Sequence, residues 1–130
     1  HAQFHYLGAL TKEEVYEEMR RCRALVVPSV CYEGGAPLTM IEAMMWRTPI
    51  LASRIGAIAD VIRDGETGYT FEPTDRDSIL SALANYEQVS HSQQMDMLNQ
   101  AADLAQAHYS KAHIMTVLQQ QYDAVCATNT

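Results

Sequence analysis

Two short, uninterrupted apolar runs constrain the fold of this chain more than any other feature. Residues 24–27 read Ala-Leu-Val-Val and stop at Pro28, and residues 49–52 read Pro-Ile-Leu-Ala. Runs this short and this continuous are typical of parallel strands that are buried on both faces of a sheet. The segment between them, residues 37–46, is almost entirely apolar and is long enough for a short helix. The sequence therefore predicts a strand, a helix and a second strand in succession.

The same alternation extends along the first 76 residues. Further expected elements are a strand at 3–7, a helix that begins at the Thr11 to Glu14 capping box, a short helix at 56–63 and a strand at 69–71. Strand and helix signals that alternate with short connections predict an α/β fold, a Rossmann-like parallel sheet flanked by helices. In such sheets, ligands bind at the carboxyl ends of the strands.

Residues 77–130 have a different pattern. Apolar residues recur there at helical spacing in three stripes, the last of which runs from Ile114 to Val125. The pattern predicts a helical tail that follows an α/β core of residues 1–76, with the stripes packed into the core. Because the last stripe is broad, it either packs on the chain's own sheet or forms an exposed interface.

Net charge and cysteine content narrow the class of partner. Nine lysines and arginines oppose 16 aspartates and glutamates, which gives a net charge of −7 at pH 7. This sign argues against binding to nucleic acid and to anionic lipid. Cys22, Cys31 and Cys126 form no C-x-x-C pair, so reduced thiols in the cytoplasm are expected rather than disulfides or a zinc site. No apolar run is long enough to span a membrane, and membrane association of a longer parent protein stays open.

The common catalytic motifs are missing. The sequence contains no P-loop, no G-x-G-x-x-G, no G-x-S-x-G and no H-E-x-x-H. His108 and His113 lie five positions apart, a spacing that would point them in different directions on one continuous helix. They are expected on the helix surface, and no metal site is predicted.

Residues 28–44 carry the strongest functional signal. They read Pro-Ser-Val-Cys-Tyr-Glu-Gly-Gly-Ala-Pro-Leu-Thr-Met-Ile-Glu-Ala-Met and begin where the first buried strand ends. Ligands bind at this edge of a parallel sheet. Gly34 and Gly35 allow the backbone to approach a ligand closely. The stretch is therefore the predicted ligand site.

The start of the predicted helix within this stretch is suited to an anion. Pro37 fits the first turn of a helix, whereas Ala36 is a poor cap. The amides around Leu38, Thr39 and Met40 are then left open at the positive end of the helix dipole. A phosphate group would satisfy these amides, and water or the Thr39 hydroxyl is the alternative.

Glu42 is the only charged residue between Glu33 and Arg47. A carboxylate buried without donors would cost several kcal/mol, so Glu42 should face a polar cavity. It lies roughly 6 to 8 Å behind the helix start, a depth that suits hydrogen bonds to the hydroxyls of a ribose whose phosphates sit at the helix end. Glu33 would reach the other side of the same phosphates. The alternative is a structural Glu42 that forms a salt bridge to a neighbouring element.

This stretch resembles the donor site of the retaining glycosyltransferases of family 4, which have the two-domain GT-B fold. The family is marked by an E-x7-E motif in a context such as P-S-x-x-E-G-x-P-L-x-x-x-E-A, which resembles residues 28–43. Other segments resemble the family in order and spacing: Phe4-x-x-x-Gly8, Thr48-Pro49-Ile-Leu-Ala52, Gly56-Ala57, Asp60-Val-Ile62, Asp64-Gly65-x-Thr67-Gly68 and Pro73-x-Asp75. The resemblance covers about residues 3–88.

The resemblance implies a role for each residue of the stretch. Glu33 would be the catalytic-site carboxylate that contacts the donor sugar, Glu42 would bind the nucleotide ribose, and Ser29 would lie near the base or ribose. The backbone of six residues would contact the sugar and the diphosphate: Gly34, Gly35, Ala36, Pro37, Leu38 and Thr39. Retention in this family is attributed to front-face attack without a protein nucleophile, with the diphosphate leaving group as base. No metal or other cofactor is normally required.

The sequence departs from the family pattern at several positions. Glu33 and Glu42 are nine positions apart, one more than in the motif, which bears on the role of Glu33. Trp46 and Arg47 stand where the family has a small residue and Gly, and Ala59 stands where Pro is common. The basic segment that clamps the diphosphate in the family would precede residue 1.

Residues 1–130 are therefore expected to be the C-terminal, nucleotide-sugar-binding domain of a GT-B glycosyltransferase. The expected fragment is truncated at its N-terminus and lacks its first strand and the acceptor-binding N-terminal domain. It should be inactive alone, because half of the groups that orient and stabilise the reacting centre would be absent. Two alternatives stay open. One is another GT-B enzyme, such as a nucleotide-sugar epimerase or a sucrose-synthesising transferase, and the other is a non-catalytic doubly wound domain that binds a ligand or docks a partner.

Overall fold

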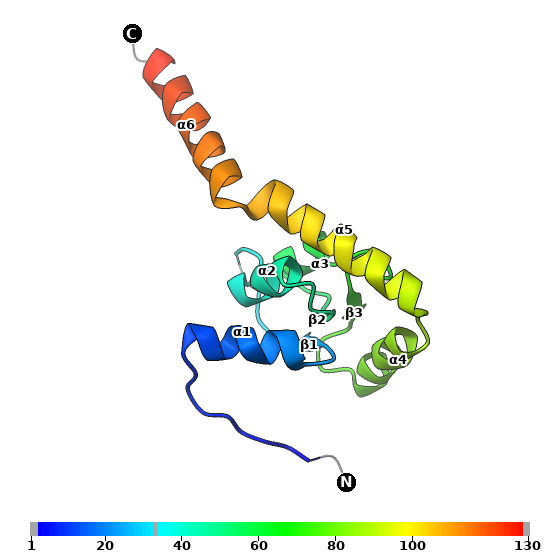
Figure 1. Ribbon diagram of the computed structural model, residues 1–130. Helices are drawn as coiled ribbons and strands as arrows, with labels where there is room; N and C mark the ends of the chain where they lie inside the picture. The colour runs from blue at the N-terminus through cyan, green and yellow to red at the C-terminus, as the bar shows by residue number, and fades with distance from the viewer. Residues whose placement is uncertain (1–2, 33, 129–130) are drawn as a thin grey trace.

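The computed structural model describes residues 3–32 and 34–128, which form a small sheet with helices on both sides (Figure 1). The strands β1 (Leu25–Val27), β2 (Ile50–Ser53) and β3 (Tyr69–Phe71) lie in the order β1-β2-β3. Both pairs are parallel, with Val26 opposite Leu51 and Ala52 opposite Thr70. The predicted parallel sheet is confirmed, and the two apolar runs form its first two strands. Burial on both faces is confirmed for β2, but it is wrong for β1, an edge strand in which Val26 is 47% exposed.

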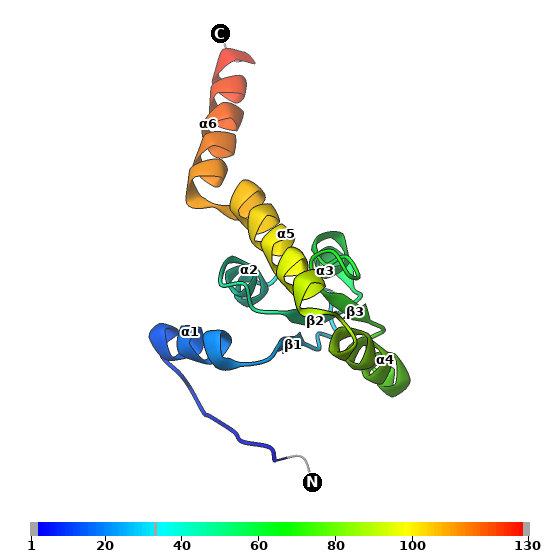
Figure 2. The ribbon, with the colours of Figure 1, turned by 45° about the vertical axis from the view of Figure 1, so that its right-hand side comes forward.

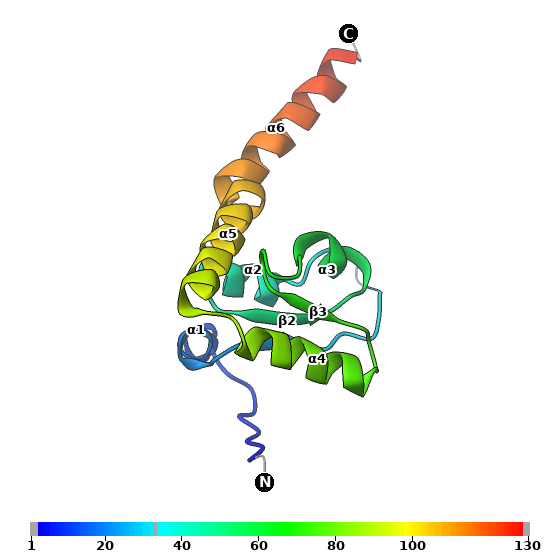
Figure 3. The ribbon, with the colours of Figure 1, turned by 90° about the vertical axis from the view of Figure 1, so that its right-hand side faces the viewer.

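Helices connect the strands and continue beyond them. They are α1 (Lys12–Arg21), α2 (Leu38–Met45), α3 (Gly56–Val61), α4 (Arg76–Glu87), α5 (His91–Tyr109) and α6 (Lys111–Thr128). The chain passes from β1 to β2 through α2 and from β2 to β3 through α3. Figure 3 shows α2, α3 and α5 on one side of the sheet and α4 on the other.

The sheet buries a separate apolar cluster on each face. Ile50 and Ala52 of β2 belong to the larger cluster, which includes residues of α2, α3 and α5. Leu51 belongs to the smaller cluster, together with Phe71 of β3 and Ala82 of α4. Alternate residues of β2 thus point to opposite faces, and both faces are covered. This double burial is the reason that the strand is a continuous apolar run.

α1 begins at the predicted capping box. The Thr11 amide donates to Glu14 Oε2 at 2.7 Å, and the Glu14 amide donates to Thr11 Oγ1 at 3.3 Å. Hydrogen bonds donated to the Glu14 carboxylate, first by the Thr11 amide and then by the Thr11 hydroxyl, lower the pKa of Glu14. Met19 is the buried residue of this helix, and Val15 and Tyr16 pack against the larger cluster. The cap therefore fixes the start of a helix that docks through one face.

The predicted strand at residues 3–7 is wrong. Residues 3–10 contain no helix or strand, and the side chains of Phe4 and Tyr6 are 88% and 84% exposed. Figures 1 and 2 show this segment running away from the sheet. Apolar alternation produces a strand only where a neighbouring strand supplies hydrogen bonds, and none of the described strands pairs with this segment.

The helical C-terminal part has a packed half and an exposed half. α5 packs on α2 and buries Met97, Ala101 and Ala105, whereas residues 111–127 of α6 are all exposed and α6 projects from the sheet (Figures 1 and 2). The prediction that the last stripe packs into the core is therefore wrong for the described residues. The chain turns at Ser110, whose backbone is extended, and this turn carries α6 away from the sheet.

None of the described helices combines the length and the apolar character needed to cross a membrane.

Candidate donor-binding site

Part of the predicted site lies at the carboxyl end of the sheet. Ser29 follows β1, residues 28–32 and 34–37 lie in the connection that leads to α2, and Arg54 follows β2 at the same edge. Gly34 and Gly35 are exposed, and a Cβ built on either glycine meets no atom within 4 Å. The packing of the chain does not require glycine at these two positions. The loop therefore leaves open space beside the strand ends.

The amino terminus of α2 has no side-chain cap. Pro37 occupies the N-cap position without a capping hydrogen bond, and the first turn contains no acidic residue. Leu38 and Thr39 are exposed, and their amides precede the first intrahelical hydrogen bonds, so both can donate to an anion. The expectation for Met40 is wrong, because its amide donates to the Pro37 carbonyl at 3.0 Å. Ala36, just before the helix, is half-buried.

Glu42 lies about one turn behind this helix start and contacts α1. Its Oε1 accepts a hydrogen bond from the Tyr16 hydroxyl at 2.9 Å and lies 3.6 Å from Lys12 Nζ. Glu42 thus forms a salt bridge to α1, which is the structural role that the sequence left open beside ribose binding. The side chain is 34% exposed, so the carboxylate also reaches solvent. The Tyr16 hydroxyl, and after it the Glu42 carboxylate, raises the pKa of Lys12 above its usual value.

A cavity of about 620 Å³ lies between the glycine loop and the start of α3. Its lining residues are Tyr32, Gly34, Arg54, Ile55, Gly56, Ala57, Ala59 and Asp60. Arg54 is held by two carboxylates, because its Nη2 lies 2.9 Å from Asp64 Oδ2 and its Nε lies 3.4 Å from Glu72 Oε1. Sequence reasoning missed Arg54, although its place directly after the buried strand β2 was the available signal. Glu33, the predicted catalytic-site carboxylate, lies outside the described residues.

The predicted residues fall into separate groups along the sheet edge. Gly34 lines the cavity at α3, whereas Thr39 lines a smaller apolar cavity of about 220 Å³ beside Leu25 and Val26 of β1. Glu42 lines neither cavity and faces α1. The start of α2 connects the groups. A ligand that touched all of them would have to be extended, from the cavity at α3 past the start of α2 toward α1.

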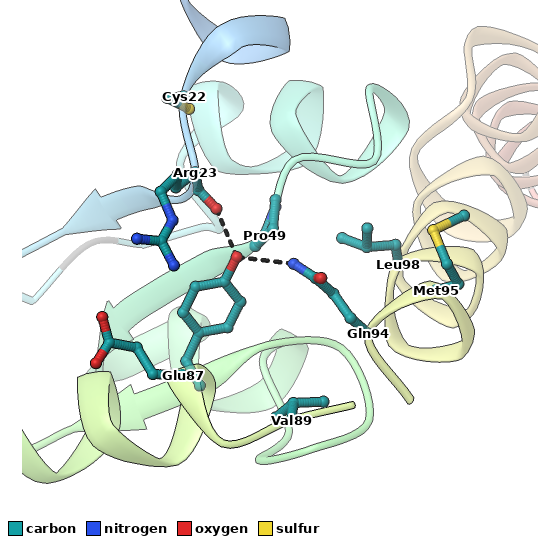
Figure 4. Close-up of a pocket in the computed structure, with 9 residues that line it drawn as sticks. Cys22, Arg23, Pro49, Glu87, Val89, Gln94, Met95 and Leu98 are labelled. Atoms are coloured by element: carbon teal, nitrogen blue, oxygen red, sulfur yellow. Dashed lines mark hydrogen bonds between the residues drawn. The ribbon is translucent and has the colours of Figure 1, made fainter. Parts of the chain in front are cut away.

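A further cavity, of about 350 Å³, lies at the opposite end of the sheet, where Arg23 and Pro49 precede β1 and β2 (Figure 4). There the Tyr86 hydroxyl donates to the Arg23 carbonyl at 2.7 Å and accepts from Gln94 Nε2 at 2.8 Å. Burial raises the pKa of the Tyr86 phenol. These hydrogen bonds join α4 and α5 to the start of β1, so the cavity belongs to the packing of the fold.

His108 and His113 contact each other, which corrects the expectation that they point apart. Their ring centroids lie 5.9 Å apart in an edge-to-face arrangement, because the helix is interrupted at Ser110 between them. Both side chains are exposed, as predicted. In the part of the chain that the structure describes, no three His, Cys, Asp or Glu side chains are grouped so that they could hold a metal ion.

Comparison with known proteins identifies the class that this fold and site define. Residues 1–88, more than half of the chain, match the model of the family described as glycosyl transferases group 1, so the chain belongs to that family. Among curated relatives, the lipopolysaccharide core biosynthesis mannosyltransferase LpcC of Rhizobium leguminosarum bv. viciae is 40% identical over 81 residues. The match covers 62% of this chain and 22% of that protein.

Solved glycosyltransferase structures share the fold. Sucrose-phosphate synthase from Thermosynechococcus elongatus superimposes with a TM-score of 0.81 at 24% identity, over 94% of this chain and 30% of that chain. HepE of Anabaena in complex with UDP-glucose gives a TM-score of 0.67 at 18% identity, over 88% of this chain and 30% of that chain. The fold is therefore that of a domain of the GT-B glycosyltransferases. The chain spans about a fifth of the mannosyltransferase and less than a third of either solved structure.

Proposed function

We propose that this chain is the donor-binding half of a retaining glycosyltransferase, which transfers a sugar from a nucleotide-sugar to an acceptor held by another domain. The observation that carries the proposal is the uncapped start of α2 beside an open glycine loop, at the carboxyl edge of a parallel sheet. Membership of the group 1 glycosyl transferases supports it. The UDP-glucose bound to the structurally similar HepE supports the class of ligand.

The diphosphate would bind at the start of α2. The exposed amides of Leu38 and Thr39 supply two donors, and the helix dipole adds about half a positive charge at this end. Gly34 and Gly35 leave the space that a phosphate needs to reach the backbone. The backbone of Ala36 and Pro37 would line the same contact, although Pro37 has no N–H to donate. These groups bind an anion without any basic side chain.

The nucleoside would extend from the diphosphate toward α1. Glu42 lies about one turn behind the open amides and keeps a partly exposed carboxylate, which would accept hydrogen bonds from the ribose hydroxyls. Ser29 is half-buried directly after β1 and would lie near the base or ribose. The extended arrangement of the candidate residues fits a ligand with separate nucleoside, diphosphate and sugar parts.

The sugar would occupy the cavity at α3, and Glu33 would contact its hydroxyls, because both chain neighbours of Glu33 line this cavity. In the reaction the bond from the anomeric carbon to the diphosphate oxygen breaks, and the acceptor oxygen bonds to that carbon from the same face. The acceptor proton passes to the leaving diphosphate. These steps use no protein nucleophile and no metal. The three free cysteines fit a reducing compartment such as the cytoplasm.

An NMR titration of the chain with UDP and GDP tests the proposal. We expect shifts at the amides of Gly34, Gly35, Leu38 and Thr39, and none at exposed residues of α6 such as Leu118. Gly35→Ala is a matched variant, because an added Cβ meets no atom within 4 Å there and φ at Gly35 is not positive. It should leave the unfolding midpoint unchanged and weaken nucleotide binding. EDTA should not affect binding.

The same titration separates the proposal from the docking alternative. If millimolar UDP and GDP both leave these amides unshifted, the donor-binding proposal is wrong and a non-catalytic partner-docking domain is favoured. The isolated chain should not transfer sugar, because the groups that hold the acceptor would lie in another domain. Measurable transfer from UDP-glucose by these 130 residues would contradict that part of the proposal.

A further inference from the structure

A hydrogen bond between α1 and α2 involves Glu42, the carboxylate that would bind ribose. Tyr16 of α1 donates its hydroxyl to Oε1 of Glu42 on α2 at 2.9 Å, across 26 positions of sequence. We propose that Tyr16 is a positioning residue for nucleotide binding, which orders the Glu42 carboxylate so that both of its oxygens can accept ribose hydroxyls. This inference rests on the donor-binding function proposed above.

The Tyr16 phenol is itself held in place by its neighbours. Its ring packs against Trp46, with centroids 5.5 Å apart and planes inclined by 50°. The guanidinium of Arg20 lies over the Trp46 ring, 4.1 Å from its centroid. Tyr16 also packs against the larger core cluster. The hydroxyl therefore has a fixed place before any ligand arrives, so it can act on the conformation of Glu42.

The hydrogen-bonding capacity of Glu42 leaves room for a ligand. An ionised carboxylate offers about four acceptor positions on two oxygens. Tyr16 uses one position on Oε1, and Lys12 lies nearest to the same oxygen. Among the described residues, none donates a hydrogen bond to Oε2. One free position on Oε1 and those on Oε2 would suffice for two vicinal hydroxyls.

Ordering of Glu42 before binding should strengthen the affinity for nucleotide. A free glutamate side chain loses rotamer freedom when a ligand fixes it, and this loss weakens binding by about two- to tenfold per ordered side chain. The Tyr16 hydrogen bond imposes part of that order in the absence of ligand. Lys12 contributes less, because its side chain is 66% exposed and exposed ion pairs are weak. Tyr16 is therefore the residue whose removal should matter most.

Tyr16→Phe provides a selective test, since it removes the hydroxyl and keeps the ring on Trp46. Dissociation constants are measured by NMR titration for UDP and for 2′,3′-dideoxy-UDP, which lacks the two hydroxyls. We expect the variant to bind UDP about three- to tenfold more weakly than the wild type. The affinity for the dideoxy nucleotide should stay unchanged, because that ligand has no ribose hydroxyls to donate to Glu42.

Tyr86→Phe is the matched control. It also removes a hydroxyl that makes two hydrogen bonds, but at the opposite end of the sheet (Figure 4). It should lower the unfolding midpoint and change the affinity for neither nucleotide. Glu42→Ala removes the carboxylate and should weaken UDP binding. Adding Tyr16→Phe to that variant should weaken binding little further, since Tyr16 then has no carboxylate left to position.

The outcomes separate this inference from the function on which it rests. If the wild type prefers UDP to the dideoxy nucleotide but Tyr16→Phe binds both as the wild type does, Tyr16 has no positioning role. If Tyr16→Phe weakens both nucleotides equally, its role is structural and the inference is overturned as well. In both cases donor binding stands. If the wild type binds neither UDP nor GDP, the proposed function fails, and the inference fails with it.

Discussion

Arg47 has a backbone conformation that L-residues rarely adopt. Its φ is 55°, in the left-handed region, directly after α2. This conformation costs an L-residue roughly 1–2 kcal/mol, whereas glycine adopts it freely. The family pattern has Gly at this position, and the structure gives the physical reason. Arg47 obtains a partial compensation, because its Nε donates to Asn99 Oδ1 of α5 at 3.1 Å.

Two substitutions separate the backbone cost of Arg47 from its hydrogen bond. Arg47→Ala removes the hydrogen bond to Asn99 and keeps the left-handed strain, whereas Arg47→Gly removes both. We expect Arg47→Gly to be more stable than Arg47→Ala by about 1 kcal/mol, measured by urea unfolding. Equal stability of the two variants would show that the backbone at this position carries no strain.

α1 is the element that connects the capping box to the candidate site. Thr11→Ala should lower the free energy of unfolding by about 1 kcal/mol, because it removes the acceptor of the Glu14 amide.

The lowered pKa of Glu14 also makes the stability of this helix depend on pH. A carboxylate whose pKa is lowered by folding stabilises the fold above its unfolded-state pKa. That contribution disappears as the pH falls through the folded-state pKa.

Glu14→Gln tests this pH dependence. The variant should be less stable than the wild type at neutral pH, and the difference should vanish in acid, where the wild-type carboxylate is also neutral. Glu13→Gln is the control, because Glu13 lies in the same turn and no capping hydrogen bond involves it. A difference between wild type and Glu14→Gln that stayed constant from neutral to acidic pH would exclude the carboxylate as its source.

At the scale of the whole molecule, the exposed helix α6 is separate from the core. Residues 111–127 are all exposed, whereas Ala101 and Ala105 of α5 are buried against the larger cluster. A chain that stops after Ser110 should therefore have a free energy of unfolding within about 0.5 kcal/mol of that of the full chain, measured by urea unfolding. A chain that stops after Gln100 should lose its cooperative transition, since it lacks both buried alanines. A large loss of stability in the first truncation would show that α6 packs on the core in solution.

Much of the fold follows from local patterns in the sequence. The apolar runs before Pro28 and after Pro49 predict the first two strands. Burial on both faces, the physical reason for such runs, holds for the central strand β2 and not for the edge strand β1, where Val26 is 47% exposed. The capping box depends only on residues a few positions apart, so the start of α1 is readable. The predicted start of α2 is one residue too early, because Pro37 and not Ala36 occupies the N-cap position, although the absence of a side-chain cap is confirmed. The candidate site could be predicted for the same reason, since the loop and the helix start are close together in the sequence.

The tertiary structure decided what depends on residues far apart in the sequence. Gly68 is required because a Cβ there would lie 2.7 Å from the Ile50 carbonyl oxygen, a contact that no local pattern reveals. The strand expected at residues 3–7 is absent, since pairing needs a neighbour that apolar alternation cannot supply. The contact of Tyr16 with Glu42 joins two helices that are separate in sequence. Sequence by itself determined the order of elements from α1 to β3 and predicted a place for the site, because both depend on short-range chemistry. Only packing determined which side chain contacts the Glu42 carboxylate and which apolar helix face stays exposed.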